Sequence, residues 1–168
     1  VQVDPSKIKF MYLPPSAIGK LGAGAKKLTN VNNWYRKTGN DMDTSLMNDG
    51  YVYFEKEYTR VKSKKSDLML QLVNPSFSST MKVYHDPFAK ETTGIGVAGV
   101  TAAGGLEKSY YVFKKGNDSA FRVMKKYYGD QFKELFGDSE EFMKKWGEKG
   151  KWSDFETHVF EYTEMMGK

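Results

Sequence analysis

Cysteine is absent from this chain of 168 residues, and histidine occurs only twice. The absence of cysteine excludes disulfide bonds, thiol catalysis and cysteine-ligated zinc. No stretch approaches the roughly 20 consecutive apolar residues that a membrane-spanning helix needs, so the sequence predicts no transmembrane segment. The first residue is Val1 rather than Met, and a removed signal peptide is one ordinary reason for this among others.

The composition is that of a folded domain. Hydrophobic residues make up 39% of the chain and aromatic residues 15%, enough to build a core filled largely by rings. The length fits a single domain over residues 1–168, strand-rich over 1–115 and helical over 117–167. Strands followed by helices predict an α+β fold, in which an antiparallel sheet of about four to five strands carries the C-terminal helices on one face.

Alternating patterns predict the strands. Ile8, Phe10 and Tyr12 alternate with polar or flexible residues, as in a half-buried strand. Short polar connections between the next runs favour an antiparallel meander. The further strands are expected at 51–61, 68–72, 81–85 and 110–113, after a weak helix over 16–37 and a loop over 38–50.

Helical spacing begins near residue 117. Phe121, Met124 and Tyr128 fall on one helical face, and Gly129 is expected to end that helix. A second helix is expected to open near Ser139. A capping box formed by Ser153 and Glu156 then predicts a last helix, whose apolar stripe is Phe155, Val159, Tyr162 and Met166.

The segment 94–105 contains G-x-G-x-x-G at Gly94, Gly96 and Gly99. In a dinucleotide-binding fold this motif follows a strand directly and opens a long helix. Here the preceding strand ends near His85 and Gly104 interrupts any helix, so no dinucleotide cofactor is expected.

Three apolar residues in that segment are costly to expose to water. They are Ile95, Val97 and Val100. Either the segment is a flexible loop that packs on the domain's own sheet, or it docks on a partner or a membrane surface.

No catalytic or metal-binding motif is present. His85 and His158 lack the spacing of a metal site, and no cofactor is expected. Neither a paired-carboxylate pattern nor a nucleophilic serine motif stands out. The sequence therefore identifies no catalytic residue, and an enzyme is not favoured.

An aromatic and basic stretch is the second candidate contact surface. The chain has a net charge of +5, and its densest basic run surrounds Ser63. Glu55 and Glu57 would repel phosphates, so no nucleic acid partner is expected. The candidate contact residues here are Tyr51, Tyr53, Tyr58, Lys62, Lys64 and Lys65.

Three stretches carry a resemblance to a known group of proteins. They are Lys82-Val83-Tyr84-His85-Asp86-Pro87, Tyr110-Tyr111-Val112-Phe113-Lys114-Lys115-Gly116, and the F-K-x-x-F-x-D-x-x-E form that begins at Phe132. Over residues 66–166 the chain resembles uncharacterised exported proteins of Bacteroidetes-type bacteria. The resemblance implies a periplasmic or secreted location, and it transfers no activity and no functional residues.

The sequence thus favours a non-catalytic exported domain that binds a protein partner or an envelope surface. An alternative is a lipid- or sugar-binding domain with an aromatic-lined pocket between sheet and helices. A hydrolase is the third possibility. The oligomeric state is not predicted.

Overall fold

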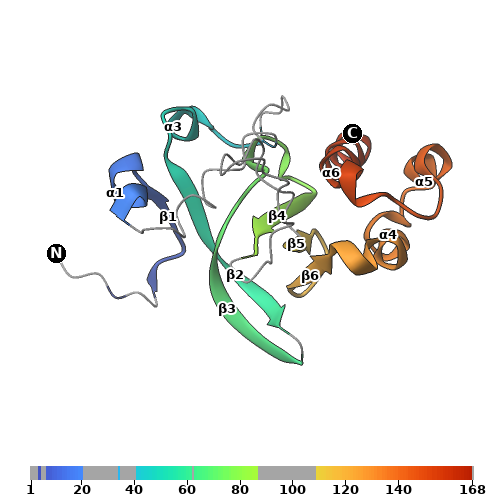
Figure 1. Cartoon of the computed structure of the whole chain (residues 1–168), viewed down its shortest axis with the longest axis horizontal. Coiled ribbons are helices and arrows are strands. Elements are labelled where there is room, and N and C mark those ends of the chain that lie inside the picture. The colour runs from blue at the N-terminus through green and yellow to red at the C-terminus, as the bar shows by residue number, and fades with distance from the viewer. Residues whose placement is uncertain are drawn as a thin grey trace, which may run out of the picture.

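The computed structural model describes Asp4, Trp34 and the ranges 7–20, 41–61, 63–86 and 109–167. Strands come first along the chain and helices gather at the C-terminal end (Figure 1). The predicted α+β class is therefore confirmed. In chain order the elements are β1 (Phe10–Leu13), α1 (Pro15–Lys20), α3 (Ser45–Asn48), β2 (Val52–Val61), β3 (Lys64–Gln71), η4 (Pro75–Phe77), β4 (Met81–His85), β5 (Ser109–Lys114), β6 (Ala120–Met124), η5 (Lys125–Tyr127), α4 (Tyr128–Phe136), α5 (Glu140–Trp146), η6 (Trp152–Asp154) and α6 (Phe155–Met166).

Strand β2 is the strand from which the sheet branches. The sheet order is β1-β2-β6-β5-β4, and β3 pairs with the other edge of β2. β2 and β6 run parallel, whereas the other strand pairs are antiparallel. The sheet is thus mixed and has six strands, rather than the four to five antiparallel strands expected. An isolated bridge between Leu72 and Tyr84 joins the end of β3 to β4, so the sheet curls.

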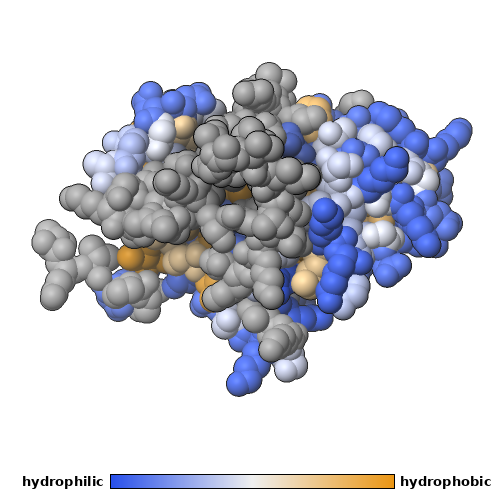
Figure 2. Space-filling view, in the orientation of Figure 1, coloured by the Kyte–Doolittle hydropathy of each residue, from blue (hydrophilic) through white to orange (hydrophobic). Residues whose placement is uncertain are grey.

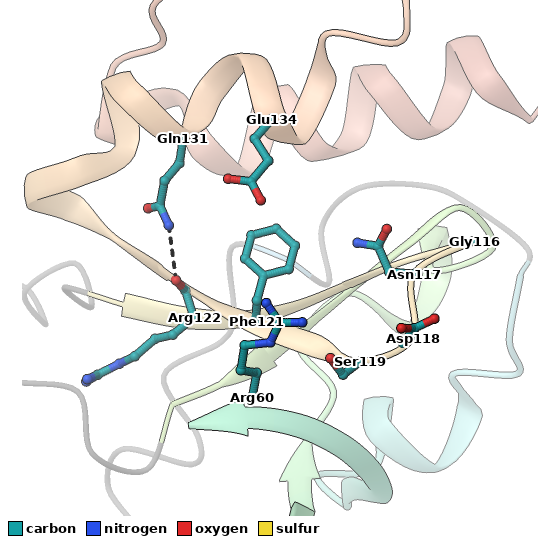
Figure 3. Close-up of a pocket in the computed structure, with 9 residues that line it drawn as sticks. All are labelled: Arg60, Gly116, Asn117, Asp118, Ser119, Phe121, Arg122, Gln131 and Glu134. Atoms are coloured by element: carbon teal, nitrogen blue, oxygen red, sulfur yellow. Dashed lines mark hydrogen bonds between the residues drawn. The ribbon is translucent and has the colours of Figure 1, made fainter. Parts of the chain in front are cut away.

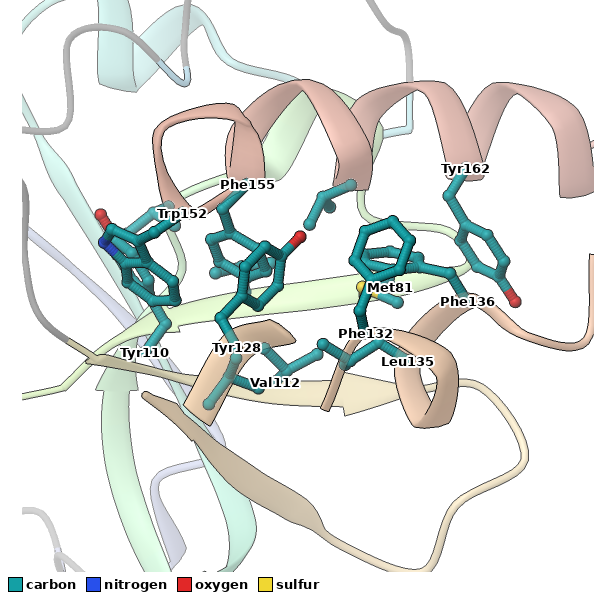
Figure 4. Close-up of a cluster of buried hydrophobic side chains, with 14 of the residues drawn as sticks. Met81, Tyr110, Val112, Tyr128, Phe132, Leu135, Phe136, Trp152, Phe155 and Tyr162 are labelled. Carbon is teal, nitrogen blue, oxygen red and sulfur yellow. The ribbon is translucent and has the colours of Figure 1, made fainter. Parts of the chain in front are cut away.

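One face of the sheet and the C-terminal helices enclose the main core. Val83, Val112 and Val123 from the strands are fully buried there, together with Phe132 of α4 and Val159 of α6. Rings fill most of the space between the layers, and Figure 4 shows them packed in a row under α6. The rings of Trp152 and Phe155 stack with centroids 5.1 Å apart.

A second, smaller core lies on the opposite face of the sheet. Strand alternation sends Tyr84 and Tyr111 to this face, while their neighbours Val83 and Val112 enter the main core. Met47 of α3 covers part of it. Both faces of the central strands β4 and β5 are consequently buried.

Residues 117–129 do not form the helix that their spacing predicted. Ala120–Met124 is strand β6, and Gly129 lies in the first turn of α4 instead of ending a helix. Pairing with β5 on one side and β2 on the other overrides the helical spacing. The boundary expected between a strand-rich half and a helical half is therefore wrong by one strand.

Three smaller expectations also need correction. The capping box does not form, because α6 begins at Phe155 after the short helix η6, and the Ser153 hydroxyl donates to Asp154 at 3.0 Å. Phe10, expected to be inward, has 60% of its surface exposed. The segment expected to be a loop before β2 contains helix α3. Most of the weak helix expected over 16–37 lies outside the described residues.

The last two helices form as expected. Ser139 caps α5 by accepting a hydrogen bond from the backbone amide of Phe142 at 3.3 Å. In α6 the stripe residues Phe155, Val159 and Tyr162 are buried, as the spacing predicted, whereas Met166, the last residue of the predicted stripe, has 44% of its surface exposed. The exposed side of α5 is mostly hydrophilic in Figure 2. Across the described ranges, no helix combines the length and apolar character needed to cross a membrane.

Replacing Phe132 by alanine is expected to lower the free energy of unfolding by about 3–5 kcal/mol, because it empties a fully buried ring site in the main core. Denaturant titration followed by tryptophan fluorescence measures the change. Phe10→Ala is the matched control and should change stability by less than about 0.5 kcal/mol. Equal losses for the two variants would contradict the assignment of the core.

Candidate partner-binding surface

The far end of the β2–β3 hairpin concentrates positive charge. The strand register places Arg60 directly opposite Lys65, and Val61 opposite Lys64. Two like charges at directly opposed positions destabilise a strand pair. The Lys65 ammonium lies 5.6 Å from the centroid of the exposed Tyr58 ring. We call Tyr58, Arg60, Lys64 and Lys65 the hairpin surface.

The carboxylates near this surface are exposed to water: Asp67 lies opposite Tyr58 in the strand register, and Asp118 lies near Lys65. Lys65 Nζ lies 3.9 Å from Asp118 Oδ2, and the Asp118 side chain is 87% exposed. A solvated pair at that distance contributes little to stability. Within the described ranges no ion pair joins Arg60 or Lys64 to a carboxylate. The lower end of the molecule in Figure 2, where the hairpin ends, is correspondingly hydrophilic.

A polar pocket adjoins the hairpin surface. The parallel pairing of β2 with β6 sets Arg60 beside Phe121, under helix α4 (Figure 3). The pocket has a volume of about 560 Å³ and opens between β2, the β5–β6 turn and α4. Its lining side chains include Arg60, Asn117, Ser119, Phe121, Gln131 and Glu134.

Some of these lining groups are already used by the fold. The Gln131 side chain accepts from the Met124 amide at 3.1 Å and donates to the Arg122 carbonyl at 3.2 Å. The Arg122 side chain points away from the Phe121 ring in Figure 3 and reaches Asp86 instead. The other polar side chains that line the pocket belong to Arg60, Asn117, Asp118, Ser119 and Glu134, and Asp118 also lies 3.9 Å from Lys65 at its exposed rim.

Asp86 anchors a buried polar cluster on the other side of the sheet. Its Oδ2 accepts from Ser109 Oγ at 2.6 Å and from Arg122 Nε at 2.6 Å, and its side chain is fully buried. Asp86 and Ser109 stand at the two ends of the segment 87–108. The cluster therefore ties together the ends of the connection that contains the glycine-rich segment.

Glu55 and Glu57 form a second cluster, around the hydroxyl of Tyr84. Tyr84 Oη lies 2.7 Å from a carboxylate oxygen of each glutamate, and Lys82 Nζ lies 2.9 Å from Glu55 Oε1. Burial, reinforced by both carboxylates, raises the pKa of the Tyr84 hydroxyl, which therefore stays protonated. These bonds cross-link β2 and β4, and they support a structural role for the two glutamates.

The two histidines lie on different elements. His85 ends β4, whereas His158 lies in α6 among rings, with its Nδ1 2.7 Å from Tyr128 Oη. Burial lowers the pKa of His158 to about 4. No group of three or more metal-binding side chains comes together in the described part of the chain.

The structure brings together only part of the predicted contact surface. Tyr58, Lys64 and Lys65 are exposed at the hairpin end. Tyr53 is buried in the second core and Tyr51 is half-buried, so Tyr53 is unsuited to contact a partner. The remaining predicted residues, Lys62, Ile95, Val97 and Val100, lie outside the described residues.

Sequence reasoning missed Arg60, Asn117, Phe121 and Glu134. The signal for Arg60 was available, because it follows Tyr58 by two residues in a strand and shares its face. The helix predicted from residue 117 includes Asn117 and Phe121, and no pattern singles out Glu134, so the sequence did not predict the approach of these three residues to β2. No protein-family model, curated protein or solved structure matches the chain at significance.

Lowering the pH is expected to destabilise the protein through His158. The folded-state pKa of about 4 lies below the ordinary histidine pKa of 6.5, so the unfolded chain binds the proton first as the pH falls. The free energy of unfolding should drop by up to about 1.4 kcal/mol per pH unit within this window, and show no contribution from His158 above it. Denaturant titrations at a series of pH values measure the slope.

His158→Gln is the control, because glutamine keeps an acceptor for Tyr128 and does not titrate. Its slope between pH 6.5 and the onset of carboxylate titration should be flatter than that of the wild type. Identical slopes in the two proteins would show that His158 does not cause the pH dependence.

Proposed function

We propose that this protein is a non-catalytic binding domain that holds an acidic segment of a partner protein against the hairpin surface. The observation that carries the proposal is the opposition of Arg60 and Lys65 in the β2–β3 register. The opposition of these two cations does not stabilise the strand pair, since like charges across a strand pair repel. A carboxylate placed between the two cations would turn the repulsion into two attractions.

The exposed ring beside these cations supports a protein partner. Tyr58 leaves 43% of its surface in water, next to Lys65. Tyrosine and arginine are enriched at the centres of protein interfaces, where a ring supplies apolar contact and a guanidinium binds carboxylates in bidentate geometry. Tyr58 would form the centre of such an interface, with the lysines at its rim.

A protein segment fits better than a membrane surface. The hairpin end is narrow and presents one exposed tyrosine ring, whereas interfacial membrane binding relies on a broad apolar face beside basic residues. The proposed periplasmic or secreted location follows from the sequence resemblance alone. Charge attraction would speed association and make it depend on salt.

The described structure offers less support for an aromatic-lined ligand pocket. Between the sheet and helices the rings of Tyr110, Trp152 and Phe155 pack on one another, with centroid separations of 5.1–5.8 Å. The pocket described above is lined mainly by polar side chains instead. Glu55 and Glu57, the two carboxylates that meet at the Tyr84 hydroxyl, are engaged by Tyr84 and Lys82, which favours a structural role for them over a role in hydrolysis.

A hexaglutamate peptide is the test ligand. Isothermal titration calorimetry is expected to show binding to the wild type that weakens steadily as salt is added. The double variant Lys64→Glu/Lys65→Glu should bind at least about tenfold more weakly, because it replaces attraction by repulsion at the rim.

Lys144→Glu/Lys149→Glu is the matched control, since it makes the same charge change at exposed positions near α5. It should retain affinity within about twofold. An equal loss of hexaglutamate affinity in the two double variants would show that binding depends only on net charge, and it would overturn the proposal. Binding to phosphatidylglycerol vesicles without binding to the peptide would replace the protein partner by a membrane surface.

A further inference from the structure

The polar pocket presents opposite charges from facing sides. Arg60 extends from the end of β2 toward the Phe121 ring, and Glu134 points down toward the same ring from α4 (Figure 3). Within the described ranges neither side chain has an ion-pair partner. A ligand with a single charge would be attracted by one of them and repelled by the other. A ligand that carries both charges satisfies both.

The Phe121 ring forms an apolar floor between these charges. In α4 the rings of Phe132 and Phe136 pack together, with centroids 5.1 Å apart. Phe121 is only partly buried against the same core and makes no ring contact among the described residues. A ring without ring neighbours at the centre of a polar pocket favours a flat apolar group stacked on it.

The size and the remaining polar groups of the pocket restrict the ligand further. A volume of about 560 Å³ lies within the range of small-molecule sites. Asn117 adds an amide that both donates and accepts hydrogen bonds. An internal peptide residue has neither terminal charge, so a free small molecule matches the paired charges better than a protein segment does.

From these features we infer that the pocket binds a small zwitterion with a flat apolar body, of the class of aromatic α-amino acids. Its carboxylate pairs with Arg60, its ammonium group with Glu134, and its ring stacks on Phe121. This small-molecule site shares Arg60 with the contact proposed for an acidic protein segment at the hairpin surface, and it differs from that contact in the class of ligand that it takes.

Three related probes test this assignment by calorimetry. L-Phenylalanine carries both charges, 3-phenylpropanoate lacks the ammonium group, and phenethylamine lacks the carboxylate. L-Phenylalanine should bind, and each single-charge analogue should bind at least about tenfold more weakly. No binding of L-phenylalanine at millimolar concentration, or equal binding of all three, would overturn the proposal.

Conservative variants assign each charge to its partner. Arg60→Met should abolish the preference for L-phenylalanine over phenethylamine, because Arg60 pairs with the carboxylate. Glu134→Gln should abolish the preference for L-phenylalanine over 3-phenylpropanoate, because Glu134 pairs with the ammonium group. Phe121→Leu should weaken all three probes while the charge preferences remain. Glu164→Gln, an exposed change on α6, is the control and should bind like the wild type. Preferences that survive in both Arg60→Met and Glu134→Gln would place the probe elsewhere and refute the site.

Measuring both ligands on the same variants distinguishes the small-molecule site from the proposed contact with an acidic protein segment. Lys64→Glu/Lys65→Glu should lose hexaglutamate binding and keep L-phenylalanine binding, because neither lysine lines the pocket. Glu134→Gln should retain hexaglutamate binding. Loss of both ligands in both variants would contradict a distinct small-molecule site.

Discussion

The parallel pairing of β2 with β6 is the constraint on which both proposed sites depend. It consists of two register pairs, Thr59 with Ala120 and Arg60 with Phe121. Because a parallel pair cannot close through a tight turn, it joins segments far apart in the chain. It brings the end of the β2–β3 hairpin beside the β5–β6 turn and under α4. Without it, Arg60 would be an isolated surface cation with no pocket next to it.

Two groups of contacts in the described fold stabilise the pairing of β2 with β6. The main core of rings fixes α4 over the sheet, while the Tyr84 hydroxyl and Lys82 bind Glu55 and so join β2 to β4. Within these clusters the buried charges are matched by partners at hydrogen-bond distance, as a low-dielectric interior requires. The like charges of the hairpin surface and the facing charges of the pocket differ in this respect, which is why we place binding there.

The sequence predicted what depends on local pattern and missed what depends on long-range pairing. Alternation located β2, β4 and β5, and the Ser139 cap and the apolar stripe from Phe155 located α5 and α6. Phe121 and Val123 also fit a strand, but their spacing with Tyr128 fits a helix equally well, and pairing with two other strands decided between them. The aromatic and basic composition of residues 51–65 predicted Tyr58, Lys64 and Lys65 as contact residues. The sequence could not predict a role for Glu134, because Glu134 approaches Arg60 only once β2 and β6 have paired.

Chemical-shift mapping of the complex with hexaglutamate tests most directly whether binding occurs at this junction. If hexaglutamate binds at this junction, the largest changes in the amide spectrum fall on residues 58–61, 63–65 and 116–122, which the β2–β6 pairing brings together. Changes confined to the outer faces of α5 and α6, or spread evenly over exposed lysines, would contradict binding at this junction and show that the peptide responds only to the overall positive charge.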